Sequence, residues 1–195
     1  MAKKGSYAKG LAKREEILTT ALHVFAERGY RRASLREISE SVGLSQAGLL
    51  HHFSSKEELF AEVLRKRDEE DLSVLIDRGN SFDALVAAMR HNADVPGLVH
   101  LYATISAEAA DTSHPGHEYF VERYKGFIAQ LEQFVRAEQE AGRLDSELDA
   151  HEVARLAIAV ADGMQVQWML DDEADMARTL EYFWSVIQRF GNATT

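Results

Sequence analysis

One short segment, residues 46–52, combines side chains suited to recognising another molecule rather than transforming it. The amide of Gln46 has the donor and acceptor needed for a bidentate bond to adenine. Ala47 and Leu50 could touch the methyl group of thymine, although Leu50 could equally pack in a core. His51 is expected on the same outward face. These residue types favour contact with a nucleic acid.

Two short predicted helices position this segment. Apolar residues recur at helical spacing over 35–42 and again over 46–52, and the turn Val42-Gly43-Leu44-Ser45 joins them. Two helices joined by a tight glycine turn are the elements of a helix-turn-helix, whose second helix enters the major groove of DNA. The residues expected to pack beneath the pair and against the preceding helix are Leu35, Ile38, Val42, Leu49 and Phe53, with Ile17, Leu22 and Phe25.

Serines are predicted to begin three helices, because a serine hydroxyl can accept a bond from an unpaired amide of the first turn. Glu37 and Glu58 stand three residues after two of these serines and complete the pattern of a capping box. The unpaired amides at the start of the helix over 46–52 can bind a phosphate group. The same holds for the start of the next helix, which has Lys56 in its first turn. The three serines are Ser34, Ser45 and Ser55.

Charge is distributed unevenly along the chain. Residues 1–56 hold ten Lys or Arg and five acids, a balance of +5, whereas the whole chain carries −10, which leaves −15 for the rest. A basic N-terminal segment in an otherwise acidic chain can bind a polyanion such as a nucleic acid. The alternative is that the charged residues only solvate the surface and are unevenly distributed by chance. Residues 1–10 are predicted to be a flexible basic arm.

The amino-acid composition is typical of a globular protein. The chain has 195 residues, of which 46% are hydrophobic and 28% charged. The absence of cysteine excludes disulfides, thiolate zinc sites and cysteine nucleophiles. No run of about 18 apolar residues is present, and the basic start leads into no apolar segment, so we expect neither a membrane span nor a signal peptide, and a cytoplasmic location.

Helical spacing of apolar residues continues to the end of the chain, and no segment alternates with the period of two that a strand requires. We predict an all-α fold of about nine helices, in which a three-helix head precedes a larger bundle. The expected ranges are Leu11 to Gly29, 35–42, 46–52, Ser55 to about Gly79, 82–92, Pro96 to about Asp111, a helix of about 25 residues ending at Gly142, 149–170 and 174–190.

Residues 11–70 resemble the DNA-binding head of the tetracycline-repressor-like (TetR) family of bacterial transcriptional regulators. The resemblance lies in Glu16-Ile17-Leu18 with Ala21, Phe25 and Gly29-Tyr30, in Ser34-Leu35-Arg36-Glu37-Ile38, and above all in GLSQAGLLHHFSSKEEL, residues 43–59. It implies a two-domain helical fold, a homodimer, and a domain over 71–195 that senses a small molecule and dimerises. It further implies a repressor that binds a palindromic operator and is released by its ligand.

The segment departs from that family at three positions. Gly48 stands where the family usually has threonine or serine, and Leu50 and His52 stand where it favours tyrosine. The alternative is therefore a helical small-molecule binding protein whose head no longer reads DNA. The residues expected to contact DNA are Lys3, Lys4, Lys9, Lys13, Ser34, Arg36, Ser45, Gln46, Ala47, Gly48, Leu50, His51, His52 and Lys56.

Two further sets of residues are expected in the C-terminal part. The first set combines aromatic and apolar residues with a few polar ones and could line a ligand pocket, or could be ordinary core. It comprises Met89, His100, Leu101, Tyr102, Ile105, Phe120, Tyr124, Phe127, Met164, Gln165 and Trp168. The second set gives the last two helices wide apolar coverage and is expected at a dimer interface. It comprises Val153, Leu156, Val160, Leu180, Phe183, Trp184, Ile187 and Phe190.

Catalysis and metal binding are weakly supported. His114 and His117 have a ligand spacing but no evident third partner, and the acidic turn 171–175 is more typical of a solvated surface. An all-helical enzyme using His100 or His114 is a remote alternative, because no constellation of catalytic groups accompanies them. We expect no catalytic residue, no metal and no cofactor.

Overall fold

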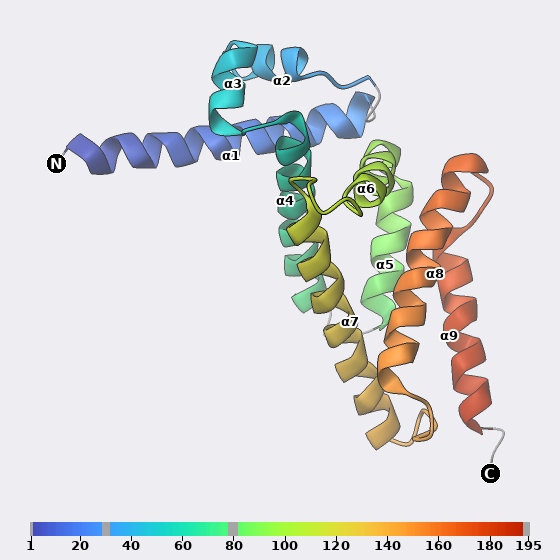
Figure 1. Cartoon of the computed structure of the whole chain (residues 1–195). Helices are drawn as coiled ribbons and strands as arrows, with labels where there is room; N and C mark the ends of the chain where they lie inside the picture. Colours follow the sequence, from blue (N-terminus) through green and yellow to red (C-terminus); the bar gives the residue numbers. More distant parts are fainter. Residues whose placement is uncertain (1, 29–31, 78–81, 193–195) are drawn as a thin grey trace. The chain divides into compact units, whose positions relative to one another are not determined.

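A computed structural model describes residues 2–28, 32–77 and 82–192, and within these ranges the chain forms nine α-helices and no β-strand (Figure 1). The predicted all-α fold is thereby confirmed. The helices are α1 (Ala2–Arg28), α2 (Leu35–Ser41), α3 (Gln46–His52), α4 (Lys56–Asp77), α5 (Phe82–Ala93), α6 (Pro96–Glu108), α7 (His117–Glu140), α8 (Ala150–Leu170) and α9 (Met176–Asn192). The predicted ranges after residue 34 agree with these bounds to within a few residues. The predicted stops at Gly29 and Gly79 lie outside the described residues.

The first helix differs from its prediction. It begins at Ala2 rather than Leu11, so residues 2–10 continue α1 and are not a separate arm. Alanine and lysine are good helix formers and no proline interrupts this stretch, so the helix extends back to Ala2 in spite of Gly5 and Gly10.

The chain divides into two compact units. The first comprises residues 1–70 and 95–119, and the second comprises residues 71–94 and 120–195. The first break falls after residue 70, and the segment containing α6, which the sequence places with the C-terminal part, belongs with the first unit, in which α6 contacts α1.

Side-chain caps begin several helices as the sequence predicts. Ser34 Oγ accepts from the amide of Glu37 at 3.1 Å, and Ser45 Oγ accepts from Gly48 at 3.0 Å. The capping box at Ser34 is incomplete, because the carboxylate of Glu37 pairs with Arg28 at 3.5 Å instead of returning to the cap. Between α2 and α3, Gly43 adopts a φ of +67°, the left-handed conformation that favours glycine.

The core of the first unit lies beneath α2 and α3. The rings of Phe25 and Phe60 meet edge to face with centroids 4.5 Å apart. Leu22, expected in this core, is only half-buried. The other residues predicted to pack there are all buried, namely Ile17, Phe25, Leu35, Ile38, Val42, Leu49 and Phe53.

The second unit is held by apolar and aromatic packing. Its main core joins α5, α8 and α9 through Phe82, Met164 and Leu180 with their neighbours. The indole of Trp184 stacks on Phe82 with centroids 4.5 Å apart and also lies 5.4 Å from the ring of Phe134. None of the helices in the described residues is long and apolar enough to cross a membrane.

Candidate nucleic-acid interface

The outward face of α3 presents the residues that the sequence singled out. Gln46, Ala47 and His51 are exposed, and Leu50 is 36% exposed. Leu49, one position earlier, is fully buried and fixes the opposite face of the helix in the core. Leu50 is therefore at the surface, where it can meet a partner.

Gly48 lies in the first turn of α3, close to the serine that caps the helix. A Cβ at this position would lie 3.3 Å from Ser45 Oγ and 3.7 Å from Leu44 Cβ. A larger residue here would crowd the cap, whereas glycine leaves it undisturbed. This short distance from Ser45 Oγ is a structural reason for glycine, rather than threonine or serine, at position 48.

The expected phosphate contacts outside α3 lie in different settings. Ser34 is exposed at the start of α2, although its hydroxyl already caps that helix. Arg36 is exposed and donates Nε–H to Glu40 Oε1 at 2.8 Å, and this hydrogen bond raises the pKa of Arg36 above its ordinary value. Lys56 is half-buried, with Nζ 5.0 Å from the centre of the Phe60 ring.

The N-terminal lysines do not behave as one group. Lys9 is exposed, and the side chains of Lys3 and Lys4 lie outside the described residues. Lys13 is not a free arm residue, because its ammonium donates to the backbone oxygen of Val42 at 2.6 Å and pairs with Glu16 at 3.0 Å. Its prediction as a residue of a mobile arm is wrong, since α1 is helical here and places Lys13 beside the end of α2.

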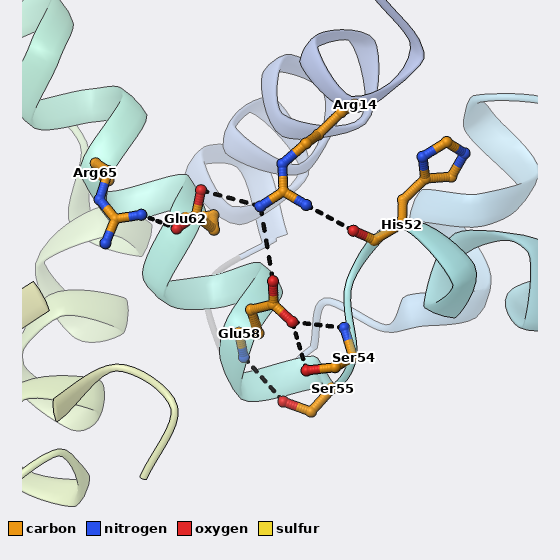
Figure 2. A network of polar contacts seen from close by, with 7 residues as sticks. All are labelled: Arg14, His52, Ser54, Ser55, Glu58, Glu62 and Arg65. Atoms are coloured by element: carbon orange, nitrogen blue, oxygen red, sulfur yellow. Dashed lines mark hydrogen bonds and ion pairs between the residues drawn. The ribbon is translucent and has the colours of Figure 1, made fainter. Parts of the chain in front are cut away.

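Arg14 occupies the centre of a polar network that the sequence reasoning missed (Figure 2). Nη1 donates to the backbone oxygen of His52 at 2.6 Å, and Nη2 donates to Glu62 Oε2 at 3.1 Å. The guanidinium also lies 3.7 Å from Glu58 Oε1 and 4.1 Å from the centre of the Phe53 ring. Its position three and four residues before buried Ile17 and Leu18 was the available signal, because that spacing puts an arginine on the buried side of α1.

Glu58 connects this network to the turn before α4. Its amide donates to Ser55 Oγ at 3.0 Å, as a cap requires, but its carboxylate accepts from the amide and hydroxyl of Ser54 rather than from Ser55. Partial burial raises the pKa of Glu58, but the bonds from Ser54 and the charge of Arg14 outweigh burial and hold the pKa below the ordinary value of 4.5.

The predicted pocket residues fall in both units, and we describe each part alone. In the first unit Leu101, Tyr102 and Ile105 are buried and His100 is exposed. In the second unit a surface groove of about 380 Å³ brings Met89 and Trp168 together. The remaining pocket residues of this unit are buried or half-buried, namely Phe120, Tyr124, Phe127, Met164 and Gln165.

One polar group among the pocket candidates has a partner of its own, since Tyr124 donates its hydroxyl to Asp162 Oδ2 at 2.7 Å.

The two histidines with a metal-ligand spacing contact the backbone. In the loop before α7, His114 Nδ1 accepts from the amide of Gly116 at 3.0 Å, and at the start of α7 His117 Nδ1 lies 2.8 Å from the oxygen of Ala109. In the part of the chain that the structure describes, no group of three His, Asp or Glu side chains is placed to hold a metal ion.

Several residues expected at a dimer interface are used within the chain instead. Val153 and Leu180 are buried in the core of the second unit, and Trp184 stacks on Phe82, because α5 and α7 cover these faces of α8 and α9. Val160, Phe183 and Ile187 are half-buried, Leu156 is 50% exposed, and the side chain of Phe190 lies outside the described residues.

A different apolar stripe is exposed on α8. Its members stand three, four, three and four residues apart, the spacing of the contact positions of a coiled coil. Leu156, Val166 and Leu170 are 50%, 48% and 84% exposed, and a Cβ added at Gly163 would meet nothing within 4 Å. The stripe consists of Leu156, Ala159, Gly163, Val166 and Leu170.

The sequence matches known proteins over part of its length. Residues 17–63 match the family described as bacterial regulatory proteins, tetR family. The HTH-type transcriptional repressor KstR2 of Rhodococcus jostii (strain RHA1) is 32% identical over 117 residues, which are 60% of this chain and 52% of that protein. The chain thus spans about half the length of this curated relative.

The fold matches solved structures over most of the chain. A transcriptional regulator from Rhodococcus sp. Rha1 aligns with a TM-score of 0.70 and 23% identity, covering 93% of this chain and 99% of that one. A transcriptional regulator from Saccharomonospora viridis, solved in complex with choline, aligns with a TM-score of 0.67 and 23% identity, covering 87% and 94%. At these identities the likeness concerns the fold.

Proposed function

We propose that the chain is a member of the tetR family of bacterial regulatory proteins, whose description it matches over residues 17–63, and that it is a ligand-responsive transcriptional repressor that binds operator DNA as a homodimer. The observation that carries this proposal is the outward face of α3. Gln46, Ala47 and Leu50 are exposed on a helix whose opposite side is fixed in the core by Leu49. As a DNA-binding regulator the protein would act in the cytoplasm.

In this proposal α3 lies in the major groove and reads base edges. Gln46 bonds to adenine, while Ala47 and Leu50 contact thymine methyl groups, so the preferred half-site is rich in A·T pairs at these positions. His51 lies on the same exposed face, next to His52, and supplies a phosphate or base contact. Gly48 allows the backbone of the helix to approach the groove closely.

Phosphate contacts would position the helix without reading sequence. The start of α4, with Lys56 in its first turn, is suited to one phosphate, and exposed Lys9 on α1 is suited to another. Ser34 and Arg36 would contact the backbone from the start of α2. Lys3 and Lys4 remain proposed contacts of the same kind.

Two copies of the chain would associate through the exposed stripe of α8. An apolar stripe at coiled-coil spacing with a glycine at its centre allows two helices to approach closely. Ala159→Glu places a charge in the middle of the stripe, so we expect the dimer to dissociate at least about tenfold more readily, because two buried like charges would face one another. Ala129→Glu, which adds the same charge on exposed α7, serves as the control. If light scattering gives the same mass for both variants, the stripe of α8 is not part of the dimer interface.

The effector would bind in the second unit. The groove that holds Met89 and Trp168 is one candidate surface, because it joins an aromatic ring to an apolar floor and an acidic rim. The Saccharomonospora viridis regulator of the same fold holds a small molecule, choline. For this chain we propose a small molecule of unassigned class, detected by a change in tryptophan fluorescence that is lost in Trp168→Phe and by a change in DNA affinity.

Selection of duplexes from a random-sequence pool by the purified protein tests the function, followed by footprinting of the enriched duplex at moderate salt. We expect a protected palindrome with half-site centres about 34–36 Å apart, the rise of one helical turn, or a greater multiple of that spacing. Weak, salt-sensitive binding with no enriched sequence would contradict the proposal. The alternative, a helical small-molecule binding protein whose head no longer reads DNA, would then stand.

A further inference from the structure

Two neighbouring cations of α1 are bonded to the carboxyl ends of both helices of the helix-turn-helix. Lys13 Nζ donates to the oxygen of Val42, the C-cap residue of α2, at 2.6 Å. Arg14 Nη1 donates to the oxygen of His52, the last residue of α3, at 2.6 Å. These acceptors lie 29 and 38 residues further along the chain. One dipeptide therefore holds the ends of two helices at once.

The carboxyl end of a helix is where such bonds have the greatest effect. The last carbonyls of a helix have no amide partner within it, and the aligned peptide dipoles make that end negative. α2 and α3 are seven residues each, too short to be stable alone, so contacts from outside determine where their ends lie.

The two cations differ in what else they contact. Besides the oxygen of His52, the guanidinium of Arg14 reaches Glu62 at 3.1 Å (Figure 2). It also lies 4.1 Å from the centre of the Phe53 ring. The second carboxylate oxygen of Glu62 accepts from Arg65. A planar guanidinium can bond to two acceptors while its face stacks on a ring, whereas an ammonium acts as a point charge. Arg14 thus ties the end of α3 to α1 and α4 together.

We propose that Lys13 and Arg14 are positioning residues for the recognition helix, setting its orientation through the carboxyl ends of α2 and α3 without contacting DNA. This inference rests on the proposed DNA-binding function and deepens it. Sequence discrimination then depends on Arg14, although the residue lies outside the exposed face of α3. Lys13 acts through α2 in the same way.

Arg14→Lys distinguishes the positioning of α3 from a simple effect of charge. The variant keeps the positive charge but loses the planar group that bonds to His52 and Glu62 at once. The probes are the duplex enriched by the wild type and a random-sequence duplex of equal length. We expect the ratio of the two affinities to fall by about tenfold, the equivalent of one charge-assisted hydrogen bond. The affinity for the random-sequence duplex should stay within about twofold, since that binding depends on charge.

Two glutamine variants provide the comparison on α1. Lys9→Gln removes an exposed lysine and should weaken binding to both duplexes alike, with a shallower salt dependence. Lys13→Gln should lower the affinity ratio instead, because it removes the bond to Val42. Equal losses on both duplexes for Lys13→Gln, or an unchanged ratio for Arg14→Lys, would overturn the inference.

Amide hydrogen exchange tests the same point without DNA. In Arg14→Lys we expect the amides of α3 to exchange about tenfold faster relative to the buried turns of α4 around Leu59 and Leu64. A uniform change across both helices indicates a general loss of stability and contradicts positioning. If the wild type enriches no duplex, the proposed function fails, and the exchange experiment still decides whether Arg14 holds α3 in place.

Discussion

The two units of this protein hold their helices in different ways. In the first unit, α2 and α3 are seven residues each and are held at their ends by serine hydroxyls, a lysine and an arginine. In the second unit, α8 extends over 21 residues, and its neighbours are joined by apolar side chains and by the stack of Trp184 on Phe82. The short helices combine a buried apolar side with directional polar bonds at their ends, whereas packing area holds the long ones.

This difference matches what each unit is proposed to do. A helix that reads base edges has to be held in one orientation, and hydrogen bonds with defined partners supply that orientation. A unit that binds a small molecule and a second copy of the chain needs apolar surface, both inside and on the outer stripe of α8. Substitutions that act on one kind of contact therefore test the comparison.

The largest expected effect is on the packed second unit. Leu180 is fully buried in its core, so Leu180→Ala should lower the free energy of unfolding by about 3–5 kcal/mol through lost contacts and the cavity left behind. Tyr182, 66% exposed on the same helix, is the control, and Tyr182→Ala should change the free energy of unfolding by less than about 0.5 kcal/mol. Urea titration measures both. An equal loss of unfolding free energy in both variants would mean that the burial of Leu180 does not determine the stability of this unit.

The corresponding pair in the first unit is Leu49 and Leu50. Leu49 is fully buried, but it lies on a seven-residue helix that can shift over a cavity, so Leu49→Ala should cost about 2–3 kcal/mol. Leu50→Ala should leave stability within about 0.5 kcal/mol and change the sequence preference of DNA binding instead. The comparison is contradicted if Leu50→Ala destabilises the fold as much as Leu49→Ala does, since Leu50 would then be a core residue.

The sequence predicts contacts between neighbouring residues better than contacts between residues that are far apart in the chain. The caps at Ser34 and Ser45 and the turn at Gly43 depend on residues within four positions of each other. The structure confirms both serine caps and the turn, whereas the carboxylate of Glu37 pairs with Arg28 instead of completing the box at Ser34. The partner of Arg14 lies 38 residues away, and only the fold brings them together. Trp184 was expected at a partner's surface because helical spacing does not say which face another helix of the same chain will cover.

A smaller, pH-dependent effect is expected at Glu58. Its folded-state pKa is lowered, so its contribution to stability is fully present above the ordinary value of 4.5 and disappears as the pH falls through the lower folded value. Glu58→Gln should therefore cost about 1 kcal/mol at neutral pH, the size of a lost cap, and progressively less below pH 4.5. Urea titrations at several pH values measure the difference. A cost that is independent of pH would show that the charge of Glu58 contributes nothing.

The smallest effect is expected at Gly48, where a local preference and a cap compete. Alanine in place of glycine stabilises a helix by up to about 1 kcal/mol, but its Cβ would lie 3.3 Å from Ser45 Oγ and displace the hydroxyl slightly. Gly48→Ala should therefore stabilise the protein by less than about 1 kcal/mol, and by more when Ser45→Ala has already removed the hydroxyl. A double-mutant cycle of unfolding free energies measures this coupling. Identical gains in both backgrounds would mean that the cap accommodates a side chain at position 48, so glycine there could no longer be attributed to the cap.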